Sequence, residues 1–186
     1  MANWNEIPLD AVAIIGAAGR FPKAQSLESL WDAIKDGRNC TDTVSSEALK
    51  ADGVPDAELG TDEYITAMGR LDDVFSFDAP LFGLTPHDAE LMDPQQRKFL
   101  ECSYEALEDA GYATNKDSRR IGVYASSSHS SYLPSRIQGA GTPRVTESLQ
   151  MAIGNDRDYL ATRVSHLLNL TGPSLTVQTA CSSSLT

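Results

Sequence analysis

One cysteine stands where a side chain could act as a nucleophile. The stretch T-V-Q-T-A-C-S-S-S-L-T, residues 176–186, begins with alternating apolar residues and runs into Cys181 and a cluster of small serines. A strand that turns sharply into a helix exposes the residue at the turn, and the positive end of the helix dipole stabilises a thiolate there. The pattern is compatible with Cys181 as a nucleophile, whose own backbone N–H could then help to stabilise an oxyanion in acyl transfer.

A structural role for the same cysteine is the alternative. A lone cysteine after a strand is commonly a small, buried hydrophobic residue. The other two cysteines, Cys40 and Cys102, are widely spaced and form no CxxC pair, so they predict neither a zinc site nor a disulfide framework. The surrounding sequence has to decide between a nucleophile and a packed thiol.

The chain before Cys181 alternates between strand and helix patterns. Expected strands cover residues 12–15, 121–125 and 174–178, and expected helices begin after Ser26, at Pro86, at Pro94 and at Asn155 or Asp156. The first two strands are continuous apolar runs of the kind that is buried on both faces of a sheet. Gln96 is placed to complete a capping box with Asp93. This alternation favours an α/β layered fold with a largely parallel sheet.

The composition excludes some classes of partner. The chain has 186 residues, 41% of them hydrophobic, and a formal net charge of -11. Binding to nucleic acid or to an anionic membrane needs clustered positive charge, so we expect neither. No apolar run approaches the roughly 20 residues of a membrane span, and the N-terminus lacks a signal-peptide pattern. A cytoplasmic location is the resulting expectation.

Several long blocks resemble β-ketoacyl synthases, the condensing enzymes of polyketide and fatty acid synthesis. The motif T-A-C-S-S-S-L around Cys181 matches their active-site motif. V-A-I-I-G-A-A-G-R-F-P at residues 12–22 is similar to the N-terminal signature of ketosynthase domains in modular polyketide synthases. Blocks at 77–97, 100–112 and 154–174 follow in the expected order, so the resemblance covers nearly the whole chain.

The resemblance implies a fold and a domain organisation. β-Ketoacyl synthases have a thiolase-like fold of αβαβα layers, of which this sequence would supply only the N-terminal half. Residues 1–10 would be an N-terminal extension, and residues 11–186 a ketosynthase N-terminal subdomain that ends just after the active-site cysteine. Because the family is usually dimeric, a homodimer through the ketosynthase is expected.

The resemblance also implies a reaction. Cys181 would take an acyl chain, as a thioester, from the phosphopantetheine arm of an acyl carrier protein. A carboxylated extender on another carrier would then lose CO2 and attack that thioester. No metal or directly bound cofactor is implied, and the expected partners are the carrier, an acyltransferase and other synthase domains. Met151 and Gln150 fall in a segment that approaches the partner's acyl tunnel in such dimers, so they line substrate or simply pack in the core.

The condensation step depends on two histidines that the family carries in motifs C-terminal to the cysteine. This chain has only His87, His129 and His166, and none of them matches those motifs. We therefore expect the 186-residue chain to be unable to complete condensation alone. Two alternatives stay open: a fatty acid synthase-type condensing enzyme, and a non-catalytic truncated fragment that only dimerises or docks. The polyketide-like N-terminal blocks weigh against the first.

Overall fold

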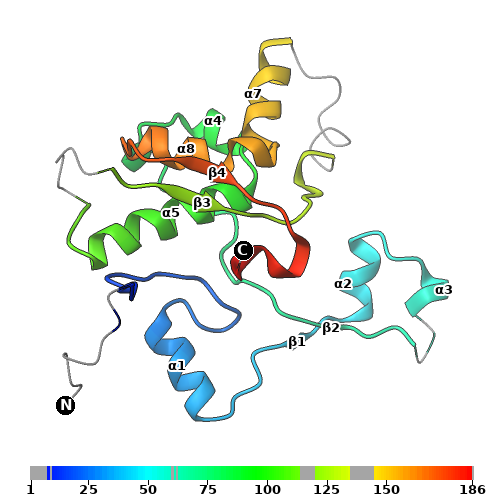
Figure 1. The fold of residues 1–186 in the computed structure, drawn as a ribbon. Helices are drawn as coiled ribbons and strands as arrows, with labels where there is room; N and C mark the ends of the chain where they lie inside the picture. Colours follow the sequence, from blue (N-terminus) through cyan, green and yellow to red (C-terminus); the bar gives the residue numbers. More distant parts are fainter. Residues whose placement is uncertain are drawn as a thin grey trace.

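A parallel pair of strands stands at the centre of the fold. The computed structural model describes residues 8, 10–59, 61, 63–113, 120–134 and 145–185 (Figure 1). Strand β3 (Val123–Ala125) pairs in parallel with β4 (Ser174–Thr176). This parallel pairing was the expectation for the second and third strand patterns, although both strands are shorter than the patterns that predicted them.

Two helices cover one face of this strand pair. Helix α5 (Pro94–Asp109) and helix α8 (Leu160–Leu167) pack against each other, and α8 also contacts both strands. The core joins the helices to β3 and to the short 3-10 helix η2 (Pro80–Phe82); its buried members are Phe82, Leu100, Val123, Ala125, Leu160, Ala161 and Val164.

The opposite face of the strand pair is open. Tyr124 on β3 is 64% exposed and Leu175 on β4 is 51% exposed. Side chains alternate between the two faces of a sheet. Val123 and Ala125, the sequence neighbours of Tyr124, therefore share the covered face and are buried, whereas Tyr124 is exposed on the open face. Residues 121–125 were predicted to be buried on both faces; that prediction is wrong, because among the described residues only one face has a helical cover.

Local capping signals set the helix starts as expected. Helix α1 (Leu27–Lys35) begins after Ser26, whose hydroxyl accepts from the N–H of Ser29 at 3.2 Å. Helix α4 (Pro86–Leu91) begins after Thr85, whose hydroxyl accepts from the N–H of Asp88. Each side chain satisfies a backbone donor that the first helical turn leaves without a partner.

Helix α5 begins after Asp93, but not with the predicted capping box. The Asp93 carboxylate accepts from the N–H of Gln95 at 2.7 Å. Gln96 does not return to cap Asp93; its side chain donates to the carbonyl of Asp156 and accepts from Arg163. The capping-box prediction is therefore wrong, because the Gln96 amide instead bonds Asp156 and, in α8, Arg163.

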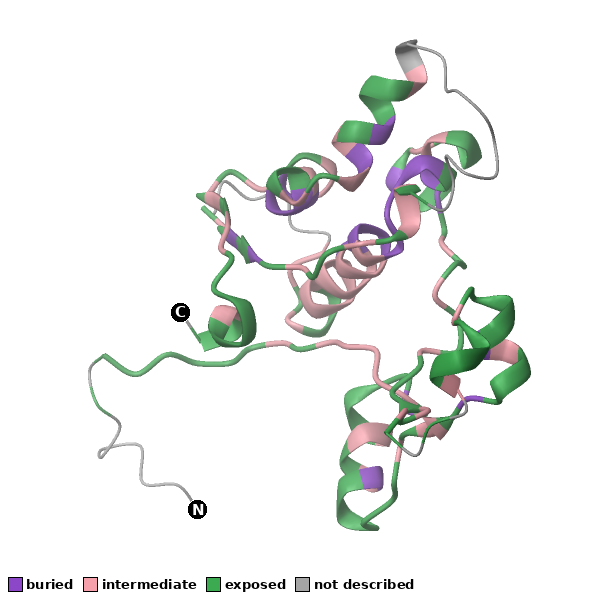
Figure 2. Cartoon of the chain, turned by 90° about the vertical axis from the view of Figure 1, so that its right-hand side faces the viewer, coloured by how far each residue is buried: buried purple, intermediate pink, exposed green. Residues whose placement is uncertain are grey.

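A smaller, open part of the chain extends away from the core. It contains β1 (Asp42–Thr43), which pairs antiparallel with β2 (Ala67–Met68), and helices α2 (Ser46–Ala51) and α3 (Asp56–Leu59). Figure 2 shows this part to be mostly exposed, whereas the buried residues gather around α5, α8 and the strand pair. This matches the irregular, turn-rich character of residues 38–80.

The first predicted strand does not form. Residues 11–20 contain no strand, and the side chains of Val12 and Ile14 are 93% and 89% exposed. The prediction of a strand over 12–15 buried on both faces is wrong for this structure, because a strand needs the backbone of a neighbour and no described residue pairs with these. Beyond it, Gly16 lies so close to α5 that an added Cβ would be 2.4 Å from the carbonyl oxygen of Ala106.

Helix α7 (Val145–Asn155) is an element that the sequence analysis did not anticipate. It packs on α4 and on the 3-10 helix η3 (Arg157–Tyr159), which leads directly into α8. The predicted start at Asn155 or Asp156 is correct for η3, because the Asp156 carboxylate accepts from the N–H of Asp158. No helix in the described ranges is long and apolar enough to cross a membrane.

Candidate functional site

Cys181 lies on the surface, five residues beyond the end of β4 at Thr176. It is exposed, and it belongs to the 3-10 helix η4 (Ala180–Leu185). The chain passes from strand to helix through Thr179 and Ala180, and Ala180 has a left-handed φ of 53°. A left-handed conformation is uncommon for a residue with a Cβ and produces a sharp change of direction. The side chain of Cys181 is therefore presented at a tight strand-to-helix turn.

The serine cluster after Cys181 ties this turn together. Ser183 accepts from the N–H of Thr179 at 2.8 Å and donates to the carbonyl of Ala180 at 2.9 Å. Ser182 donates from its hydroxyl to the carbonyl of Thr179 at 2.9 Å. These serines are small, as the motif required, and their hydroxyls also hold the backbone on both sides of Ala180.

A second serine-rich segment runs alongside the end of β4. The serine loop, residues 126–131, leaves β3 after Ala125, whose carbonyl accepts from the N–H of Val177 at 2.8 Å. With the Gln178 amide turned so that its oxygen faces the N–H of Ser127, that oxygen accepts from the N–H at 3.2 Å and the amide nitrogen donates to the Ser127 carbonyl at 3.1 Å. Gln95 makes the same two bonds with Ser128, at 3.1 Å and 3.3 Å. Sequence reasoning missed both glutamines.

Met151 and Gln150 are not brought to Cys181. Both lie on α7, which Figure 1 shows rising away from the sheet, apart from the helix at the C-terminus. Met151 is buried at 8% exposure, and the exposed Gln150 donates to the Asp88 carboxylate of α4 at 3.2 Å. Met151 is buried on α7, which packs on α4, and a substrate-lining role for either residue stays a prediction.

The histidines occupy separate places. His87 is largely exposed on α4, with its Nε2 atom 4.0 Å from the Glu147 carboxylate. His129 is exposed in the serine loop and lines a cavity of about 380 Å³ whose lining includes Asn155 and Arg157 but not Cys181. His166 lies in the last turn of α8. The three imidazoles therefore belong to three different elements, none of which is the turn that carries the cysteine.

The other two thiols differ from Cys181 in their surroundings. Cys102 lies in α5, where burial raises the pKa of its thiol, with Glu105 and Glu101 acting in the same direction and Arg20 opposing them. Cys40 is half-buried in the segment that precedes β1. Within the described ranges, no three His, Cys, Asp or Glu side chains gather as metal ligands. Cys181 is the exposed thiol among the three.

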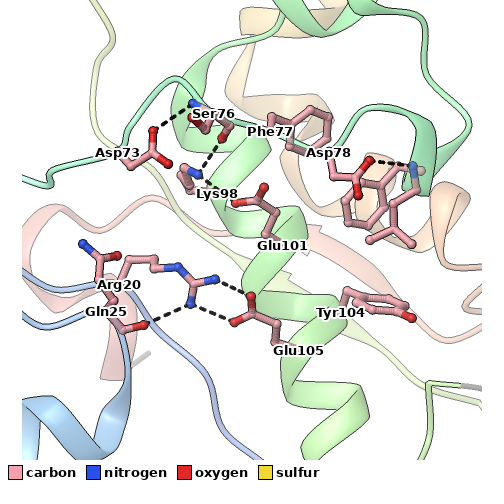
Figure 3. A pocket seen from close by; sticks show the side chains of 12 residues that line it. Arg20, Gln25, Asp73, Ser76, Phe77, Asp78, Lys98, Glu101, Tyr104 and Glu105 are labelled. Carbon is pink, nitrogen blue, oxygen red and sulfur yellow. Dashed lines mark hydrogen bonds and ion pairs between the residues drawn. The ribbon is translucent and has the colours of Figure 1, made fainter.

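A charged cavity of about 540 Å³ lies beside α5, lined in part by Lys98, Glu101 and Glu105 of that helix (Figure 3). Arg20 forms an ion pair with Glu105, and this hydrogen bond raises the pKa of the Arg20 guanidinium. Lys98 pairs with Glu101 at 2.9 Å and donates to the carbonyl of Ser76. These charged groups are already paired with one another. The contacts of Arg20 and Lys98 join the N-terminal segment and residues 73–78 to α5.

Comparison with known proteins places this geometry in a family. A sequence profile described as "Beta-ketoacyl synthase, N-terminal domain" matches residues 9–186. The chain is 41% identical over 186 aligned residues to one of the phenolphthiocerol/phthiocerol polyketide synthase polypeptides of Mycobacterium tuberculosis. It is 38% identical over 181 residues to polyketide synthase PksL of Bacillus subtilis. Each alignment covers 96% of this chain, but only 12% and 4% of the two relatives.

Solved structures give the same result. Ketosynthase twelve of the bacillaene polyketide synthase of Bacillus amyloliquefaciens superposes with a TM-score of 0.78 at 31% identity. That match covers 93% of this chain and 30% of the solved one. The module 6 ketosynthase of the bacillaene synthase of Bacillus subtilis superposes with a TM-score of 0.70 at 33% identity, covering 95% and 28%.

Proposed function

Because this chain belongs to the β-ketoacyl synthase family, we propose that Cys181 is its acyl-accepting nucleophile. The chain corresponds to the N-terminal part of a ketosynthase domain of the polyketide synthase type, with the thiolase-like fold. The observation that carries the proposal is the presentation of an exposed thiol at the strand-to-helix turn between β4 and η4. A buried structural cysteine would have no access to an acyl donor.

The proposed step is transfer of an acyl group between two sulfur atoms. The Cys181 thiolate attacks the carbonyl carbon of an acyl-pantetheine thioester, and a tetrahedral oxyanion forms. The oxyanion collapses, the bond to the pantetheine sulfur breaks, and that sulfur leaves as a thiolate that takes up a proton. The backbone N–H of Cys181 is the proposed donor to the oxyanion, because such a donor stabilises charge that develops only in the transition state.

The partners are proposed from the same family membership. The acyl donor is the phosphopantetheine arm of an acyl carrier protein, and an extender on a second carrier would supply the carbon nucleophile for condensation. An acyltransferase and other synthase domains, and a second ketosynthase copy, are the further proposed partners. The relatives named above are polyketide synthases, and this chain spans about an eighth or less of their length.

We propose that this chain by itself stops at the acyl-enzyme. Decarboxylation of an extender generates carbanion charge that positioned donors must stabilise. The histidines lie on α4, in the serine loop and at the end of α8, and His87 is engaged beside Glu147. Incubation with acyl- and malonyl-carriers should therefore release no β-ketoacyl product above background.

Intact-protein mass spectrometry tests the acyl transfer itself. The chain is incubated with an acyl-pantetheine thioester, and Cys181→Ala serves as the matched variant. The proposal expects a mass increase of one acyl group in the starting chain and none in Cys181→Ala. Equal acylation of both chains, or none in a folded starting chain, would contradict it.

A non-catalytic docking or dimerising fragment is the second candidate. The apolar side chains of Val12, Ile14 and Trp31 are largely exposed, and an exposed apolar surface is typical of a protein–protein contact. The same mass measurement separates the two functions. A folded chain that associates but never carries an acyl group on Cys181 would favour the docking role.

A further inference from the structure

Two glutamine amides hold the serine loop by its backbone from two sides. Gln178, two residues beyond the end of β4, bonds both the N–H and the carbonyl of Ser127. Gln95, in the first turn of α5, bonds both the N–H and the carbonyl of Ser128, and its own N–H is fixed by the Asp93 carboxylate at 2.7 Å. Two consecutive loop residues therefore have their backbone groups satisfied by side chains from separate elements.

The Gln178 amide extends the pairing between the two strands. The last backbone bond between them runs from the N–H of Val177 to the carbonyl of Ala125. One position further, a primary amide offers one donor and one acceptor in a single plane, as a peptide group on a neighbouring strand would. Gln178 thus ties the end of β4 to the serine loop at the point where backbone pairing stops.

This tie lies immediately before the turn that presents Cys181. Thr179 and Ala180 alone separate Gln178 from the cysteine, and Ala180 holds a left-handed φ of 53°. A residue with a Cβ keeps such a conformation only where its surroundings fix the chain on both sides. The Ser182 and Ser183 hydroxyls bond the backbone of Thr179 and Ala180 from within the turn, and Gln178 fixes the chain just before Thr179 to the serine loop.

We propose that Gln178 is a positioning residue for Cys181. Its amide anchors the entrance of the turn to the serine loop, and Gln95 anchors that loop in turn to α5. Loss of the anchor lets Ala180 relax to an ordinary φ, which displaces the Cys181 sulfur from the direction in which a thioester approaches. The role in acyl transfer rests on the proposed function, whereas the effect on thiol presentation does not.

The test compares variants of the full chain with matched controls. Gln178→Ala removes both bonds to Ser127, and Gln178→Glu keeps the shape and the acceptor but loses the donor. Gln25→Ala removes an exposed glutamine amide that donates to the Asp72 carboxylate at 3.5 Å, far from the turn in sequence. Circular dichroism and amide hydrogen exchange at Ser127 report folding and loss of the anchor. Two rates are measured at Cys181: alkylation by iodoacetamide, and acylation by an acyl-pantetheine thioester over a range of concentrations.

The expected result is a lower maximal rate of acylation in Gln178→Ala, by roughly tenfold, because misplacing a reacting atom by about 1 Å can cost about a hundredfold. The donor concentration at half-maximal rate stays the same, since Gln178 is not proposed to touch the donor. Alkylation slows as well, Gln178→Glu recovers part of both rates, and Gln25→Ala changes neither.

A folded Gln178→Ala chain with both Cys181 rates unchanged overturns the inference, and so does an equal slowing in Gln25→Ala. If Gln178→Ala does not fold, Gln178→Glu decides by the same criterion. A starting chain that is alkylated but never acylated defeats the proposed function, and slower alkylation in Gln178→Ala then still supports the positioning role.

Discussion

The three thiols of this chain differ in their exposure and in their neighbours. Cys181 is exposed at the turn after β4, whereas Cys102 lies half-buried within α5 near the carboxylates of Glu101 and Glu105. The T-A-C-S-S-S-L motif singled out the candidate nucleophile from the sequence alone, and the strand pattern before it placed it at the end of a strand. The anchoring glutamines could not be predicted, because Gln95 and Gln178 are 83 positions apart and only the fold brings both to one loop.

Thiol labelling should be selective and should depend on pH. Burial raises the pKa of the Cys102 thiol above its ordinary value, so at a given pH a smaller fraction of it is thiolate. We expect iodoacetamide to label Cys181 before Cys102, with Cys102 labelling increasing as the pH rises through its raised pKa. Peptide mass mapping over a pH series measures both rates, and the denatured chain is the control. Faster labelling of Cys102 than of Cys181 in the folded chain would count against this account.

Asp93 should be important for stability. Its buried carboxylate caps α5 by accepting from the N–H of Gln95. Asp93→Ala should lower the free energy of unfolding by about 1 kcal/mol, a typical loss for an N-cap, whereas Asp93→Asn keeps an acceptor and should lose less. Chemical denaturation measures the change, with the exposed Asp52→Ala as control. Equal stability of Asp93→Ala and the starting chain would show that the cap is not used.

Secondary-structure elements follow the sequence where their signals are local. Ser26 and Asp93 cap α1 and α5 as predicted, because a cap needs only residues within the first turn. The strand expected over 12–15 and the capping role of Gln96 were wrong, since the first depends on a distant backbone partner and the second was displaced by contacts with Asp156 and Arg163. Helix α7 was missed because its sequence, V-T-E-S-L-Q-M-A-I-G-N, includes β-branched residues and a glycine, which are weak helix formers.

Close approach of two backbones makes Gly172 necessary beside β3. Its N–H donates to the carbonyl of Ile121 at 2.9 Å, and an added Cβ would lie 2.5 Å from the backbone nitrogen of Gly122. Gly172→Ala must therefore push the segment before β4 away from β3, at a cost on the order of 1–3 kcal/mol. Thermal unfolding compares it with the exposed neighbour Thr171→Ala, which should change little. If Gly172→Ala and Thr171→Ala have the same unfolding temperature, the close approach is not required.

The whole molecule leaves an unusual amount of apolar surface exposed. Val12, Ile14 and Ile15 are 93%, 89% and 62% exposed, and Trp31 and Ile34 on α1 are about as exposed as Ile15, at 59% and 60%. The second face of the β3–β4 pair is also open at Tyr124 and Leu175. The fold family and the parallel strand pair were predictable from motifs and alternation, but the exposed faces are a property of the whole arrangement and carry no sequence signal of their own.

Self-association should follow from this surface. Exposed apolar side chains favour contact with other chains, against the repulsion of a net charge of -11. Light scattering should show an apparent mass that rises with protein concentration, and a Val12→Lys/Ile14→Lys double variant should lower it. Glu28→Gln on the polar side of α1 is the control. A chain that stays monomeric over the whole concentration range would refute the expectation.

The most direct test of the acyl-transfer account asks which thiol an acyl group protects. The folded chain is treated with an acyl-pantetheine thioester, then labelled with iodoacetamide, digested and mapped by mass spectrometry. The account predicts that the peptide containing Cys181 carries the acyl group and escapes alkylation, while Cys40 and Cys102 are labelled as in untreated chain. An acyl group found on Cys40 or Cys102 instead, with Cys181 still open to alkylation, would contradict it.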